Sequence, residues 1–197
     1  PSQPLKGILM DPSKWSALHQ QFLPEAFRKQ GYNTNFYYGG DLDFANIGAF
    51  LQFVGFQKIH SYPNNKNSKW GVNDETMGSL VLNDIQKLPE PFFASWLMLS
   101  SHEPYDVVGN AHLPEAEKLK LSVQYSDAAL GKLVEGLKKS HRYDSTVIVV
   151  VSDHSKSVGL PVTEDYEQEF FRIPLIIAGG PIRDMYRGVA PHLIVSQ

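Results

Sequence analysis

The sequence contains no cysteine. Disulfide bonds and thiolate metal sites are therefore excluded, and any metal ion must be held by Asp, Glu, His or hydroxyl groups. An apolar run of the roughly 18 to 20 residues that a membrane-spanning helix needs is also missing. Concentrated basic charge is absent as well, because 18 Lys and Arg stand against 21 Asp and Glu. Since binding to a phosphate backbone requires a basic face, nucleic acid is not an expected partner.

The start of the chain, Pro1 to Pro4, shows no initiator methionine and neither the charged nor the apolar segment of a signal peptide. The chain as given is therefore expected to be soluble and to be cut from a longer protein. Its 197 residues, 42% of them hydrophobic, suffice for one substantial core. No internal repeat or linker divides it, so residues 1–197 are interpreted as a single partial domain.

Short apolar strands alternate with amphipathic helices along the chain. This pattern is typical of an α/β fold in which a largely parallel sheet is sandwiched by helices. The run Phe92–Leu99 is apolar almost throughout, which suits a strand buried on both faces. Strands are predicted at residues 33–38, 57–60, 92–99, 146–151 and 173–178, and helices at 24–30, 43–54, 74–87 and from about 114 to the basic residues 138–142.

In open α/β sheets, ligands bind beyond the carboxyl ends of the strands, so polar residues that follow a strand are site candidates. Asp153 and His154 come directly after the strand 146–151. A carboxylate beside an imidazole offers two ligands to a divalent ion such as Mn²⁺ or Zn²⁺. The alternative interpretation is a loop carboxylate that is hydrogen-bonded to its neighbours.

His102 takes the same position after the strand 92–99. An imidazole there can donate a hydrogen bond to a phosphate or sulfate oxygen or protonate a leaving group, and it can also merely satisfy loop carbonyls. After the strand 33–38, Gly39-Gly40 allows a tight turn that brings amides close to an anion, and Asp41 can bind a substrate hydroxyl. The alternative for this segment is a plain turn.

The segment Trp70-Gly71-Val72-Asn73-Asp74 is interpreted as a loop docked at the same edge of the sheet. A helix start with an apolar staple contact explains it equally well. No Gly-x-Ser-x-Gly elbow is present, so a serine-hydrolase triad has no support.

In their order and spacing, these segments resemble the alkaline phosphatase and sulfatase superfamily, closest to its lipoteichoic acid synthase-like branch of phosphoglycerol transferases. The resemblance covers nearly the whole chain. It rests on Gly31-Tyr32, Phe36-Tyr37-Tyr38-Gly39-Gly40-Asp41, Gly55-Phe56, Trp70-Gly71-Val72-Asn73-Asp74-Glu75, Ser101-His102-Glu103-Pro104, Tyr125-Ser126-Asp127-Ala128-Ala129-Leu130-Gly131, Ser152-Asp153-His154 and Arg172-Ile173-Pro174-Leu175-Ile176-Ile177.

The resemblance implies a metal-dependent enzyme that acts on phosphate or sulfate esters. A threonine nucleophile, or a formylglycine in sulfatases, forms a covalent intermediate in this superfamily. Asp153 and His154 match its metal-binding pair, His102 matches a histidine that contacts the transferred group, and Asp41 falls near a substrate-binding aspartate. The expected ion is Mn²⁺, with Zn²⁺, Mg²⁺ and Ca²⁺ as alternatives. The nucleophile and the remaining metal ligands match no residue here, so we expect them upstream of Pro1.

Departures from the family pattern limit what the resemblance implies. Ala45 and Ile47 stand where synthases carry Trp and Arg, and Ser155-Lys156 stands where many relatives carry Gly, so glycerol phosphate specificity does not follow. The parent protein is expected to be membrane-anchored with this domain outside the cytoplasm, and the isolated chain to be inactive. One alternative is a non-catalytic domain on the same fold that binds glycans or lipid headgroups. Another is a generic α/β protein in which Asp153 and His154 are structural.

Overall fold

A computed structural model describes residues 11–18, 21–62, 67–106, 112–154 and 173–182. Parts of the expectations above depend on residues outside these ranges, namely residues 1–4, Ser155-Lys156 and Arg172. The elements, in chain order, are η1 (Pro12–Ala17), α2 (Leu23–Lys29), β1 (Asn33–Tyr38), η2 (Phe44–Asn46), α3 (Ile47–Phe53), β2 (Lys58–Ser61), α4 (Asp74–Ile85), β3 (Phe92–Leu97), α5 (Glu115–Lys139), η4 (Tyr143–Ser145), β4 (Val147–Val151), β5 (Leu175–Gly179) and η6 (Gly180–Ile182).

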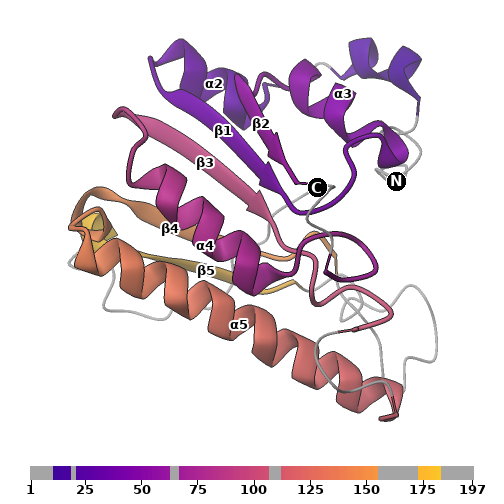
Figure 1. The fold of residues 1–197 in the computed structure, drawn as a ribbon. Coiled ribbons are helices and arrows are strands. Elements are labelled where there is room, and N and C mark those ends of the chain that lie inside the picture. The colour runs from indigo at the N-terminus through magenta and orange to yellow at the C-terminus, as the bar shows by residue number, and fades with distance from the viewer. Residues whose placement is uncertain (1–10, 19–20, 63–66, 107–111, 155–172, 183–197) are drawn as a thin grey trace.

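Three strands form a parallel sheet in the order β2-β1-β3 (Figure 1). In the central strand, Tyr37 lies opposite His60 of β2 and Trp96 of β3. Because the strands are parallel, their carboxyl ends lie at one edge of the sheet, which we call the carboxyl edge. The loops that carry Asp41 and His102 leave the sheet there. The predicted parallel α/β arrangement is confirmed for these strands.

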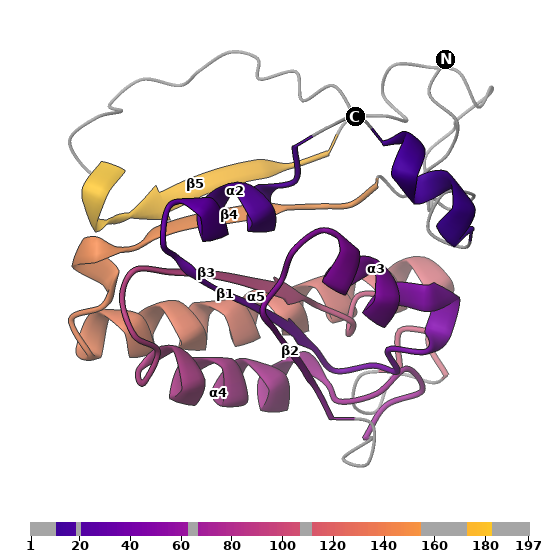
Figure 2. The same cartoon turned by 90° about the horizontal axis from the view of Figure 1, so that it is seen from above.

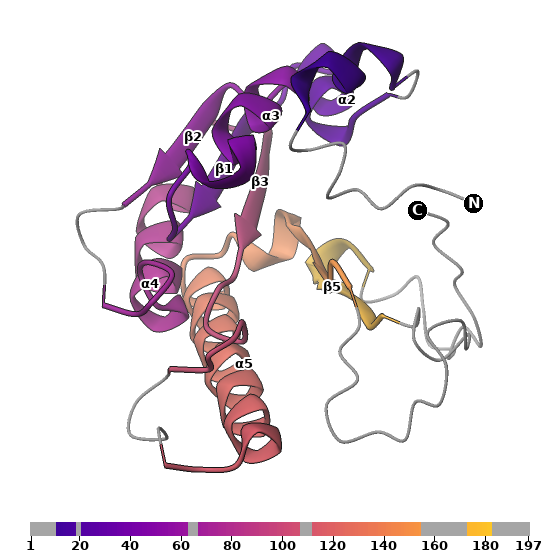
Figure 3. The ribbon, with the colours of Figure 1, turned by 90° about the vertical axis from the view of Figure 1, so that its right-hand side faces the viewer.

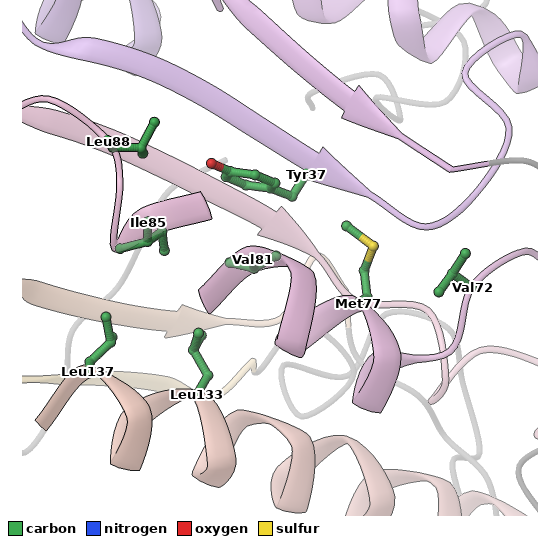
Figure 4. Packing of buried hydrophobic residues seen from close by; sticks show 8 residues of the cluster. All are labelled: Tyr37, Val72, Met77, Val81, Ile85, Leu88, Leu133 and Leu137. Carbon is green, nitrogen blue, oxygen red and sulfur yellow. The ribbon is translucent and has the colours of Figure 1, made fainter. Parts of the chain in front are cut away.

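Helices cover both faces of this sheet, with α2 on one side and α4 and α5 on the other (Figures 1 and 3). Successive side chains of β1 point to opposite faces. On one face Tyr37 belongs to a core cluster that includes Met77 of α4 and Leu133 of α5, as labelled in Figure 4. On the other, Phe36 packs with Leu51 of α3. Burying each such side chain fully stabilises the fold by about 1.5–3 kcal/mol. Since β1 supplies residues to both faces, both layers of the core assemble around this strand.

The longest helix, α5, covers 25 residues and begins after Pro114. Its first turn carries Glu115 and Glu117 and its last turn Lys138 and Lys139, charges that complement the helix dipole at each end. The predicted role of the basic run at a helix end is thus confirmed. No helix in the described ranges is long and apolar enough to cross a membrane.

The remaining strands, β4 and β5, form a separate antiparallel pair in which Val149 lies opposite Ile177. Figures 1 and 2 show β4 running in the same direction as β3, so its carboxyl end points to the same side of the molecule as the His102 loop. One face of the pair places Ile148 against the core cluster. The opposite face is open, with exposed fractions of 49 to 56% for Val147, Val149, Val151 and Ile177.

Candidate active site

His102 lies at the junction of two consecutive turns that follow β3. Its amide donates to the carbonyl oxygen of Leu99 at 3.0 Å, and its own carbonyl accepts from the amide of Tyr105 at 2.9 Å. The ring Nδ1 lies 2.9 Å from the carbonyl oxygen of Glu103. Because a carbonyl oxygen only accepts, this contact places a proton on Nδ1, so Nε2 is the ring nitrogen that remains for a ligand. The imidazole is exposed, so a phosphate or sulfate oxygen can reach it.

Trp70 fixes the orientation of that imidazole. Its Nε1 donates to the carbonyl of Glu103, the same group that Nδ1 of His102 contacts. The two rings also meet edge to face, with centroids 4.8 Å apart at 67°. Next to it, the amide of Lys69 donates to Oδ2 of Asp106 at 2.5 Å. The expectation that this loop docks at the carboxyl edge is therefore confirmed, although the sequence did not show that Trp70 contacts the histidine.

Asp41 follows β1 on an exposed turn at the same edge. Its Oδ1 accepts from the amide of Asp43 at 2.9 Å, which stabilises the turn locally. One residue further, Phe44 packs against Trp70 with ring centroids 5.8 Å apart. Trp70 therefore contacts both the loop of Asp41 and the loop of His102. The structure brings these two predicted residues to one side of the molecule, and the role of Asp41 in substrate binding stays a prediction.

Gly39 and Gly40 let the loop after β1 pack closely against the backbone of Gly71 and Val72. The amide of Val72 donates to the carbonyl of Gly39 at 2.9 Å, and Gly40 forms an isolated bridge with Gly71. A Cβ on Gly39 would lie 2.5 Å from the carbonyl oxygen of Val72, and one on Gly71 would lie 2.0 Å from that of Gly39. This close approach of two backbones requires glycine at positions 39 and 71. A plain turn at 39–40 would not require it.

Gly71→Ala is expected to lower the free energy of unfolding by about 2–4 kcal/mol, because the new Cβ overlaps a backbone oxygen that cannot move aside. Gly131→Ala is the matched control. A Cβ at Gly131, in α5, meets nothing within 4 Å, so better helix propensity should stabilise the protein by up to about 1 kcal/mol. Urea unfolding measures both changes, and a Gly71→Ala protein as stable as wild type would contradict the close packing of these loops.

Asp153 and His154 lie on an exposed turn after β4. Oδ1 of Asp153 accepts from the amide of His154 at 3.0 Å, and the hydroxyl of Ser152 donates to the carbonyl of His154 at 2.7 Å. This leaves Oδ2 of Asp153 3.7 Å from Nε2 of His154. Ligands about 2.1 Å from one cation lie roughly 3 to 3.5 Å apart, so the pair fits a shared divalent ion after a small adjustment.

By themselves, these two side chains offer fewer ligands than a metal centre needs. Within the described ranges, no group of three or more His, Cys, Asp or Glu side chains is placed to hold a metal ion. Structural and catalytic metal sites take three or four protein ligands. Any further ligands are expected upstream of Pro1, and this stays a prediction.

A comparison with known families decides the relationship. The Sulfatase family model matches residues 4–184, which is nearly the whole chain. The chain belongs to the Sulfatase family. It is 31% identical over 162 residues to phosphoglycerol transferase I of Xanthomonas campestris pv. campestris, with 68% of the chain and 22% of that protein covered. Lipoteichoic acid synthase 2 of Bacillus subtilis is 23% identical over 188 residues, with 83% of the chain and 29% of that protein covered.

A solved structure agrees with this assignment. A protein of the alkaline phosphatase superfamily from Vibrio parahaemolyticus superposes on this Sulfatase-family chain with a TM-score of 0.72 and 29% identity, covering 91% of the chain and 45% of that protein. The predicted superfamily and its phosphoglycerol transferase branch are thus confirmed. The chain spans less than a third of the length of the two enzymes named above.

Proposed function

We propose that this Sulfatase-family chain supplies one half of the active site of a metal-dependent phosphoglycerol transferase or sulfatase-like hydrolase. The enzyme acts on phosphate or sulfate esters. The observation that carries the proposal is the convergence of the His102 and Asp41 loops on Trp70, in a chain 31% identical to a phosphoglycerol transferase. At the carboxyl edge, an imidazole can donate a hydrogen bond to an ester oxygen of such a substrate, and a carboxylate can accept one from a neighbouring hydroxyl.

Each candidate residue has a distinct role in this proposal. As the imidazolium, with protons on both ring nitrogens, His102 donates from Nε2 to an oxygen of the transferred group and passes that proton to the leaving oxygen, while Asp41 binds a substrate hydroxyl. Asp153 and His154 provide two ligands of a divalent ion, Mn²⁺ first, with Zn²⁺, Mg²⁺ and Ca²⁺ as alternatives. When bound, such an ion neutralises charge on the transferring group and activates the nucleophile.

The proposal extends to the rest of the protein. Residues 1–197 form one partial catalytic domain, and the nucleophile with the other metal ligands lies in sequence outside it. The isolated chain is therefore expected to be inactive. The complete protein is expected to be membrane-anchored, with this domain on the extracytoplasmic side, and similarity to lipoteichoic acid synthase 2 supports this placement.

The test is turnover by the full-length protein of phosphatidylglycerol and of aryl phosphate and sulfate esters. We expect turnover of at least one of these ester classes, its loss after chelation, and its recovery with Mn²⁺. Calorimetry with Mn²⁺ and glycerol phosphate separates the alternative, a domain that binds glycans or lipid headgroups without catalysis. Binding without turnover of any of these esters, with Mn²⁺ present, would overturn the proposal.

A further inference from the structure

A buried carboxylate, Asp74, lies directly behind the His102 loop. Its side chain is 1% exposed, and it is the first residue of α4. Oδ1 accepts from the amide of Leu99 at 2.8 Å, while Oδ2 accepts from the amide of Ser100 at 3.2 Å and from the hydroxyl of Ser126 at 2.6 Å. The amide of Asp74 in turn donates to Oγ of Ser100 at 2.9 Å. We call these four residues the Asp74 clamp.

The clamp joins three parts of the chain that are far apart in sequence. Asp74 opens α4, Leu99 and Ser100 follow β3, and Ser126 lies in α5. Burying a carboxylate is costly unless donors surround it, so each of the three hydrogen bonds offsets part of that cost. The position at the amino terminus of α4, where the helix dipole favours negative charge, adds to their strength.

The clamp holds one end of the loop and Trp70 holds the other. Leu99 and Ser100 start the turns at whose junction His102 lies, since the amide of His102 donates to the carbonyl of Leu99. At the far end, the indole of Trp70 donates to the carbonyl of Glu103. With both ends tied, the backbone of His102 has little freedom to shift.

We propose that Asp74 and Ser126 are positioning residues for His102. The inference rests on the proposed function, because it assumes that His102 contacts the transferred group. Catalysis depends on such placement, and a shift of about 1 Å can cost about 100-fold in rate. The proposal also gives a role to Asp74 and Ser126, which lie in two segments of the family resemblance to which no chemistry is otherwise assigned.

Ser126→Ala tests the clamp without unpairing the backbone, because Asp74 keeps its two amide donors. Ser122→Ala is the matched control, since Ser122 is buried one turn earlier in α5 and its hydroxyl donates to the carbonyl of Leu119 at 2.7 Å. Ser126→Thr retains the hydroxyl and serves as the rescue. All three are made in the full-length protein.

Ser126→Ala is expected to lower kcat about tenfold while KM changes less than twofold, the pattern of an interaction that matters in the transition state. Deuterium exchange at the amides of Leu99 and Ser100 should accelerate about tenfold as the carboxylate loosens. Ser126→Thr should restore both properties, and Ser122→Ala should change neither.

Exchange at the two amides separates this inference from the proposed function, because it is measured without substrate. Wild-type exchange in Ser126→Ala, or the same acceleration in Ser122→Ala, would overturn the clamp. Faster exchange with an unchanged kcat would overturn its role in positioning His102. A wild-type protein that turns over no ester would instead contradict the proposed function, and exchange would still decide whether the clamp holds the loop.

Discussion

Asp153→Asn in the full-length protein is expected to abolish Mn²⁺-dependent turnover, with a loss of at least about 10³-fold. A bound ion contributes several kcal/mol to stabilising the transferring group, and each 1.4 kcal/mol is about a factor of ten in rate. Asparagine retains an oxygen to accept from the amide of His154, so the turn after β4 should persist. What it removes is the negative charge that strengthens the binding of a divalent cation by a carboxylate.

The measurement is the initial rate over a range of Mn²⁺ concentrations, with calorimetry to follow metal binding. Asp144→Asn provides the control, since Asp144 lies in η4 just before the opposite end of β4. It should leave both the rate and metal binding unchanged. Wild-type activity in Asp153→Asn would refute the assignment of this residue as a ligand.

His102→Gln is expected to lower kcat by about 10² to 10⁴, the usual contribution of a general acid or base. Glutamine keeps a hydrogen-bond donor at this position but cannot transfer a proton. The comparison of aryl esters with good and poor leaving groups separates the two roles of His102. If the imidazole protonates the leaving oxygen, the loss should shrink for good leaving groups, whereas loss of a hydrogen bond to the transferred group should affect all esters alike.

The control for this variant is His112→Gln, because His112 is exposed and lies before α5, away from the candidate residues in the sequence. It should retain wild-type kcat and KM. A His102→Gln protein that also retains wild-type kcat with every ester would remove His102 from the active site.

Local features of the fold were predictable from the sequence. The strand at 33–38 was predicted with its observed bounds, because Gly31 and Gly39-Gly40 end the flanking elements on either side of an aromatic run. The predicted helix 74–87 is observed as α4, which Asn73 caps by accepting from the amide of Thr76 at 3.0 Å. The rule that sites follow strand ends selected Asp41 and His102 as candidates, and their roles stay predictions.

Features that depend on distant residues were not predictable. The predicted helix 43–54 is broken, because Ala45 and Asn46 adopt φ values of 53° and 59° that no helix repeat encodes. The strand at 92–99 was expected to be buried on both faces, and this was wrong. Its residues are half-buried and Leu97 is 36% exposed, because β3 lies at the edge of its three-stranded sheet.

The candidate site shows the same limit. Ser126 donates to Asp74 across 52 residues, and a serine on an amphipathic helix gives no sign of its partner. The indole of Trp70 likewise reaches Glu103 across 33 residues. Periodicity identifies the face that a side chain occupies, whereas the pairing of two loops depends on how the helices and strands pack together.

The open face of β4 and β5 sets how the isolated chain will behave in the test tube. Four β-branched side chains stand side by side on it, and each strand pairs on one edge only within the described ranges. Exposed strands of this composition recruit further copies edge to edge and face to face. Salts such as sulfate, which strengthen apolar association, will lower the concentration at which this begins. Colloidal stability, more than catalysis, will therefore govern work on the isolated chain.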